Sequence, residues 1–173
     1  MNMVRNLSIW LIAFLMSGCA VYPTTRTYFE PNKEDGTPTR STSCGYHAAA
    51  NDSLERQIGG VSVVVSPRYK EGGNLSLSVS LHYDEEGVVI DGSLITVAIN
   101  GGASYHPTNV IVNSYKKDNT HSNRIFLHIF YAVPSESVTE LSVTLPNIMN
   151  KPSSPFRFKK ATKSDIYYAS INC

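Results

Sequence analysis

The stretch Leu75-Ser76-Leu77-Ser78-Val79-Ser80-Leu81-His82-Tyr83 alternates apolar and polar residues without a break. A period of two places successive side chains on opposite faces of a β-strand, so one face of this segment packs into a core and the other meets water. Serine and histidine occupy the even, water-facing positions. The segment therefore predicts a half-buried strand in an antiparallel sheet.

Short apolar or alternating segments recur around this strand and are separated by turn residues such as Ser66-Pro67 and Asn100-Gly101-Gly102. They cover residues 61–65, 94–99, 110–112, 124–131, 139–145, 156–159 and 165–171. Residues 124–131 are apolar on both faces apart from His128, which predicts a central strand covered on both sides. His128 is then expected to be a partly buried, hydrogen-bonded imidazole.

About eight short strands without interleaved helices predict an all-β domain over residues 44–173. We expect an antiparallel β-sandwich of about seven to eight strands, with a barrel as the second choice. An immunoglobulin-like topology is one option, although the only tryptophan, Trp10, lies outside this domain. The one helical candidate is a brief turn over residues 48–58, capped by Asn51 or Asp52.

Residues 1–18 have the three parts of a secretory signal. Arg5 lies in a short positive region, the apolar run 7–16 follows, and small residues lead to Cys19. The apolar run is shorter than the roughly 20 residues that a membrane-spanning helix needs. We therefore expect an export signal and not a transmembrane helix.

The segment Leu15-Met16-Ser17-Gly18-Cys19 resembles the lipobox of bacterial lipoproteins, with Met16 in place of the usual leucine. In that family a peptidase cuts before the cysteine after a diacylglycerol has been attached to its sulfur. The resemblance implies that Cys19 becomes the lipidated first residue, held in the membrane by two or three acyl chains such as palmitate. Ala20 stands where aspartate would signal inner-membrane retention in enteric bacteria, which implies the periplasmic face of the outer membrane in a Gram-negative host. The alternatives are cleavage after Ala20, giving a soluble secreted protein, or an uncleaved anchor.

Residues 19–43 show no hydrophobic period and contain scattered prolines among threonine, serine and charged residues. This composition predicts a lipidated, disordered tether. Once Cys19 carries lipid, Cys44 and Cys173 remain, and an even pair in an oxidising compartment favours a disulfide between them. The alternatives are two free thiols or a bond from Cys173 to another chain.

The sequence contains no motif that points to catalysis. His-Glu-x-x-His, Gly-x-Ser-x-Gly and phosphate-loop patterns do not occur, and the five histidines have no metal-ligand spacing. The acidic residues of 84–91 lack the EF-hand spacing and read better as an exposed hairpin than as a calcium site. We therefore predict no catalytic residue, cofactor or metal site, and a protein that is not an enzyme.

The charge and the aromatic content of the sequence limit which classes of partner we expect. The net charge is +1, and Arg5 is the only charged residue before Arg26, so the chain from Cys19 onward is formally neutral. A neutral domain lacks the basic surface that nucleic acid requires. The basic cluster Arg157, Lys159, Lys160 and Lys163 is interpreted as a solvated strand edge. Of the ten tyrosines, Tyr105 and the pair Tyr167-Tyr168 are the first candidates for contact with sugars or proteins.

Together these features favour a membrane-anchored, non-enzymatic envelope lipoprotein that binds another envelope protein. A module that binds glycan or peptidoglycan, or a periplasmic inhibitor of hydrolases, is the alternative.

Overall fold

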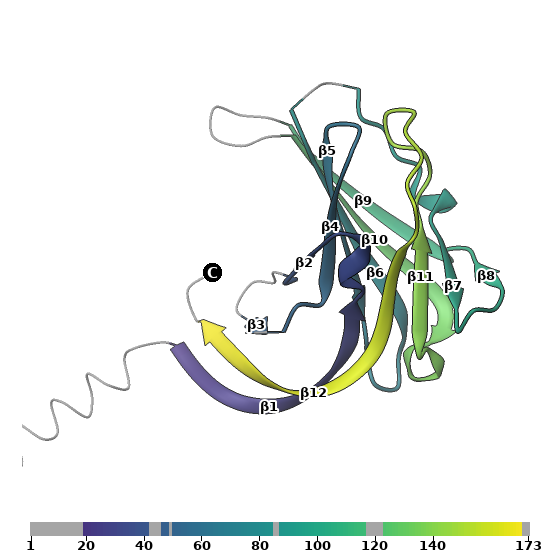
Figure 1. Ribbon diagram of the computed structural model, residues 1–173. Helices are drawn as coiled ribbons and strands as arrows, with labels where there is room; N and C mark the ends of the chain where they lie inside the picture. The colour runs from purple at the N-terminus through teal and green to yellow at the C-terminus, as the bar shows by residue number, and fades with distance from the viewer. Residues whose placement is uncertain (1–18, 42–45, 49, 85–86, 117–122, 171–173) are drawn as a thin grey trace, which may run out of the picture.

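The computed structural model describes residues 19–41, 46–48, 50–84, 87–116 and 123–170. Within these residues, twelve strands form two six-stranded antiparallel sheets that pack together (Figure 1). The predicted all-β antiparallel sandwich is therefore confirmed. It has more strands than the seven or eight expected, and it is larger than the seven-stranded immunoglobulin arrangement.

The first sheet follows the order β1 (Cys19–Pro31), β12 (Phe156–Ser170), β11 (Glu140–Thr144), β7 (Thr96–Ile99) and β8 (Ser104–Tyr105), with β3 (Tyr46–Ala48) also paired to β12. The second sheet follows the order β2 (Thr37–Thr39), β4 (Ser53–Ile58), β5 (Val61–Arg68), β6 (Asn74–Tyr83), β10 (Asn123–Pro134) and β9 (Asn109–Tyr115). Three short 3-10 helices lie between strands: η1 (Lys33–Asp35), η2 (Gly92–Leu94) and η3 (Ser135–Ser137).

The core lies between the two sheets. Strand β6 contributes to it through the alternate apolar residues that point inward. Leu75, Leu77, Val79 and Leu81 are all buried, while the intervening serines lie on the outer face. The first sheet faces them with buried side chains from β7, β11 and β12 and from the residue just before β7, namely Ile95, Val97, Leu141, Val143, Phe156 and Phe158. Truncating one of these large residues to alanine is expected to cost about 2–5 kcal/mol.

The composition predicts a tether over residues 19–43, but residues 19–31 and 37–39 form strands, and residues 42–43 lie outside the described residues. Residues 19–31 are strand β1, which pairs with β12 from Cys19 opposite Ser170 to Pro31 opposite Phe158. Figure 1 shows the two strands curving away from the sandwich as a ribbon, which we call the arm. Proline is tolerated here because β1 lies at a sheet edge, and its threonines and aromatic residues favour extended backbone.

The helical turn expected over residues 48–58 is also wrong, since residues 53–58 form β4. Leu54 and Ile58 lie on the same face of this strand, with Arg56 between them. Arg56 points inward because its guanidinium stacks on the ring of Phe156, at 4.1 Å from the ring centroid. An inward arginine hides the period of two in this segment.

The two last predicted strands, 156–159 and 165–171, are parts of one strand, β12. The basic cluster of this region was interpreted as a strand edge, and that interpretation is wrong: β12 lies between β1 and β11. The charges are tolerated because they point outward and find partners. Lys163 pairs with Glu30 at 2.7 Å, and Lys160 donates to the backbone oxygen of Glu136 at 2.6 Å.

Strand β10 was expected to be covered on both faces, but only one face is covered. Ile125, Leu127 and Ile129 are buried, whereas His128 is exposed and Phe130 is 39 % exposed. The physical reason is that the described residues form two sheets and place no third layer over the outer face of the second one (Figure 1). The structure therefore leaves aromatic residues on an open sheet face.

Candidate functional site

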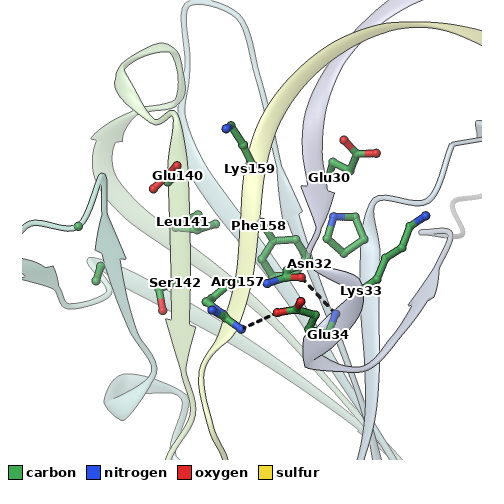
Figure 2. Close-up of a pocket in the computed structure, with 13 residues that line it drawn as sticks. Glu30, Asn32, Lys33, Glu34, Glu140, Leu141, Ser142, Arg157, Phe158 and Lys159 are labelled. Atoms are coloured by element: carbon green, nitrogen blue, oxygen red, sulfur yellow. Dashed lines mark hydrogen bonds and ion pairs between the residues drawn. The ribbon is translucent and has the colours of Figure 1, made fainter.

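One cavity lies on the outer face of the first sheet and has a volume of about 680 Å³ (Figure 2). Residues 30–34 form one wall, and β11 and β12 form the other. Its lining carries both charges, with Glu30, Glu34 and Glu140 against Lys33, Arg157 and Lys159. Arg157 is already held by acidic residues of η1, and Glu30 by Lys163, so much of this charge is neutralised internally.

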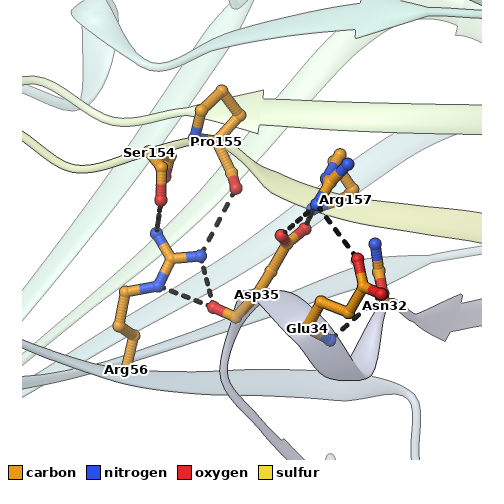
Figure 3. Close-up of polar contacts among 7 residues, drawn as sticks. All are labelled: Asn32, Glu34, Asp35, Arg56, Ser154, Pro155 and Arg157. Carbon is orange, nitrogen blue, oxygen red and sulfur yellow. Dashed lines mark hydrogen bonds and ion pairs between the residues drawn. The ribbon is translucent and has the colours of Figure 1, made fainter.

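Asp35 links this cavity to the end of the sandwich (Figure 3). Its carboxylate accepts hydrogen bonds from the backbone N–H and the side chain of Arg157, and these bonds hold the pKa of the carboxyl below its usual value. Its backbone oxygen accepts from Nε of Arg56 at 2.7 Å. Nη1 of Arg56 also donates to the backbone oxygen of Ser154 at 2.6 Å. The two arginines thus join η1, β4 and β12, which is a structural role.

A second polar network attaches the arm. Arg26 on β1 forms an ion pair with Asp52, and its Nη1 lies 3.6 Å from Oδ2 of Asp165 on β12. Asp52 also accepts from the backbone N–H and hydroxyl of Ser41, at 2.6 and 2.8 Å. Both carboxylates are buried. The single positive charge of Arg26 offsets part of the buried negative charge where three segments of the chain meet.

The third feature is a groove of about 440 Å³ on the open outer face of the second sheet. Strands β5, β6 and β10 form its floor, and residues 39–41, at the end of β2 and just after it, form a wall. The strand registers define the rows that cross the floor. The first row is Ser62, His82 and Arg124; the second is Val64, Ser80 and Phe126; the third is Ser66, Ser78 and His128; the fourth is Arg68, Ser76 and Phe130.

Three arginines line this groove: Arg40, Arg68 and Arg124. Glu55 is the one acidic residue of the lining, and it accepts a hydrogen bond from Ser62 at 2.6 Å. Burial lowers the pKa of His82, and the positive charge of Arg124 lowers it further. The imidazole is therefore neutral at pH 7, in a groove whose charge is positive.

The residues that the sequence analysis singled out do not come together in one site among the described residues. Cys19 is the first residue of β1, whereas Cys44 and Cys173 lie outside the described residues, so the disulfide stays a prediction. Tyr105 is exposed on β8, and the backbone of Tyr167-Tyr168 pairs with β3. His128 is exposed instead of partly buried, and its Nδ1 lies 3.3 Å from the hydroxyl of Ser78.

The groove arginines were missed by the sequence reasoning. Arg40, Arg68 and Arg124 are spread over more than eighty positions. The pairing of β5, β6 and β10 brings Arg68 and Arg124 to one face, and the segment after β2 adds Arg40 to the lining. The outward serines of β6 were a usable signal, because they marked a polar face opposite the core.

Within the described residues, no group of three metal-ligating side chains occurs, and no helix is long and apolar enough to cross a bilayer. Comparisons with protein-family models, with curated proteins and with solved structures find no match to this chain.

Proposed function

We propose that this chain is a lipid-anchored, non-enzymatic envelope protein that binds an extended segment of another protein along the free edge of β9. The observation that carries the proposal is the composition of that edge. The absence of catalytic motifs from the sequence and the internal pairing of the polar networks support a binding role over catalysis.

The edge of β9 differs from those of the other edge strands among the described residues. Strand β8 has two residues, β3 has three, β2 has three and contains Pro38, and β1 contains Pro23 and Pro31. Short length and proline are the usual means of blocking unwanted strand pairing. Strand β9 has seven residues and contains neither a proline nor a charge.

Strand β9 also presents apolar side chains. Ile111 is 46 % exposed, Val112 53 % and Tyr115 60 %. A free edge offers backbone N–H and C=O groups for pairing, and alternating side chains beside it supply specificity for an added strand. An extended polypeptide segment with apolar residues at alternate positions fits both requirements.

The anchor is proposed at Cys19, on the resemblance of residues 15–19 to a lipobox. Because Cys19 is also the first residue of β1, a lipid on its sulfur would be attached directly to the arm. The sandwich would then be held to the membrane through a paired strand and not through a flexible linker.

Site-specific photocrosslinking in envelopes tests the partner site. A crosslinker at position 111 should give an adduct that maps to one contiguous segment of a second protein. The matched control is position 166 on β12, where Ile166 has a similar exposure of 43 % but lies on the arm. Val112→Lys should remove the adduct, since a charge would enter the pairing edge. Equal labelling from both positions, or an adduct of this chain with itself, contradicts the proposal.

A further inference from the structure

We propose that the groove on the outer face of the second sheet is a binding site for a linear acidic glycan, with Arg68, Arg124 and Arg40 as the residues that receive its anionic groups. This site is separate from the β9 edge and does not depend on the function proposed there.

The first argument is that these arginines differ from the others of the described chain. Arg26, Arg56 and Arg157 are each bound to carboxylates or backbone oxygens. Within the part of the chain that the structure describes, none of the three groove arginines contacts a carboxylate. The one polar contact among them joins Nε of Arg68 to the hydroxyl of Ser78 at 3.3 Å. Guanidinium groups gathered without their usual anions favour an anion from outside.

The second argument is that polar atoms of the groove are left unsatisfied. Nε of Arg124 and the hydroxyl oxygen of Thr39 are both buried from water and have no hydrogen-bond partner. Both residues line the groove, one on the floor and one on the wall. Buried polar groups are nearly always hydrogen-bonded, so within the described residues these two atoms mark a polar lining whose hydrogen-bonding capacity is not used internally.

The shape of the site favours a linear ligand. Arg124 lies in the first row of the floor and Arg68 in the fourth. Residues two apart in a strand are about 6.7 Å apart, so three rows separate the two arginines by about 20 Å along the strands. Between them the floor presents the hydroxyls of Ser78 and Ser80. A single small anion would satisfy only one end of such a groove.

A glycan fits better than an acidic peptide. The groove runs over a sheet face, where the backbone groups of β6 and its neighbours are already paired. A peptide therefore has no strand edge to join, and recognition depends on side chains. Hydroxyls, guanidiniums and the ring of Phe126 are the groups that match sugar hydroxyls, carboxylates and the apolar face of a pyranose. The volume of about 440 Å³ also falls in the range of small-ligand sites, about 300–1,000 Å³.

Titration calorimetry with defined oligomers tests the proposal. The probes are oligogalacturonate, its methyl ester and oligoglutamate of the same length. Oligogalacturonate should bind to the purified chain. Its methyl ester lacks the negative charges, so it should bind at least about tenfold more weakly. Binding of oligoglutamate as tight as that of oligogalacturonate would assign the groove to acidic peptides and overturn the glycan proposal.

The double variant Arg68→Gln/Arg124→Gln should weaken oligogalacturonate binding by at least about tenfold. The matched control is Lys33→Gln/Lys159→Gln, which removes two charges from the cavity of the first sheet. An equal loss of affinity in both variants would show unspecific charge attraction and overturn the proposal. The proposal is also overturned if none of the probes binds below millimolar concentration. Arg68 is exposed, so Arg68→Gln alone serves as the variant if the double substitution does not fold.

Discussion

Arg157 holds both carboxylate oxygens of Asp35. Its Nε donates to Oδ2 at 2.8 Å and its Nη2 to Oδ1 at 2.5 Å, while its backbone N–H also donates to Oδ2 at 3.0 Å. Two parallel bonds of this kind fix the geometry of an arginine and a carboxylate as well as their charge. The pair connects η1 to the start of β12. Because Asp35 is titratable, the pair also makes the stability of the fold depend on pH.

The first prediction is that Asp35 contributes to acid unfolding. Its pKa is lowered in the folded protein, chiefly by the side-chain hydrogen bonds from Arg157. The pair therefore stabilises the fold above the ordinary pKa of an aspartate, about 3.9. This stabilisation is lost as the pH falls through the lower folded-state value. Urea unfolding of the wild type should lose more stability between about pH 5 and about pH 2 than unfolding of Asp35→Asn does.

Glu34→Gln is the control for that experiment. Glu34 lies on the same short helix, but its side chain is 84 % exposed and its oxygen is 4.0 Å from Arg157. This variant should keep the pH dependence of the wild type. A parallel pH dependence for Asp35→Asn and the wild type contradicts a role for the pair.

The second prediction concerns Asn100, which ends β7 with a positive φ of 53°. Its Oδ1 accepts from the backbone N–H groups of Thr139 and Glu140, at 2.8 and 3.0 Å, and its Nδ2 donates to the backbone oxygen of Ser137 at 2.9 Å. Asn100→Ala removes these bonds and puts alanine in a left-handed conformation. We expect a loss of about 2–4 kcal/mol in the free energy of unfolding.

Two further variants separate the two causes. Asn100→Gly accepts the positive φ, so its loss measures the hydrogen bonds alone and should be smaller by about 1 kcal/mol. Asn150 also has a positive φ, of 58°, without such bonds, so Asn150→Ala should cost only the backbone strain. Equal losses in Asn100→Ala and Asn150→Ala would show that the hydrogen bonds contribute nothing.

The third prediction is that Arg26 is required for attachment of the arm. Its side chain is 21 % exposed, and it lies between the buried carboxylates of Asp52 and Asp165. Arg26→Leu leaves these carboxylates without their cation, which is expected to cost about 3 kcal/mol in unfolding free energy. Adding Asp52→Asn and Asp165→Asn should recover part of the loss, because the uncompensated charge is then gone. No recovery in the triple variant means that the packing of Arg26 matters and its charge does not.

The sandwich follows from the sequence wherever one face of a strand is apolar and the other polar. The serines of β6 marked its outer face unambiguously, so the strand and its orientation were predicted. The prediction failed where an edge position or an inward charged residue breaks the alternation. Pro23 and Pro31 made β1 look like a linker, because proline excludes central strands but not edge strands.

The candidate sites depend on contacts between distant residues, which a single sequence does not contain. Arg56 at an inward position of β4 is explained only by Phe156, one hundred residues later. Arg68 and Arg124 share a groove only because β6 pairs with β5 on one side and with β10 on the other. The sequence shows which residue types are present. That they lie together in space can be known only from the register in which the strands pair.

The fourth prediction concerns the anchor. Cys19→Ser removes the sulfur that the lipobox resemblance assigns to lipid, so the variant should leave the membrane fraction and appear in the soluble periplasm or medium. Its melting temperature should equal that of the delipidated wild-type chain. Sedimentation of the variant with membranes after a high-salt wash contradicts lipid anchoring at Cys19.

The last prediction distinguishes an arm from a tether. Trypsin cuts after arginine in backbone that can leave its neighbours, and paired strands resist it because local unfolding must come first. Arg26 lies within the β1–β12 ladder, opposite Lys163, whereas Arg40 is exposed and follows the end of β2. Under limiting trypsin, mass spectrometry should detect cleavage after Arg40 well before cleavage after Arg26. In Arg26→Lys/Asp165→Asn, where the network on the arm is weakened but the cut site is kept, cleavage at position 26 should become faster. Equally rapid cleavage at both positions in the wild type would show that residues 19–31 behave as a linker, and that the lipid does not hold the sandwich through a strand.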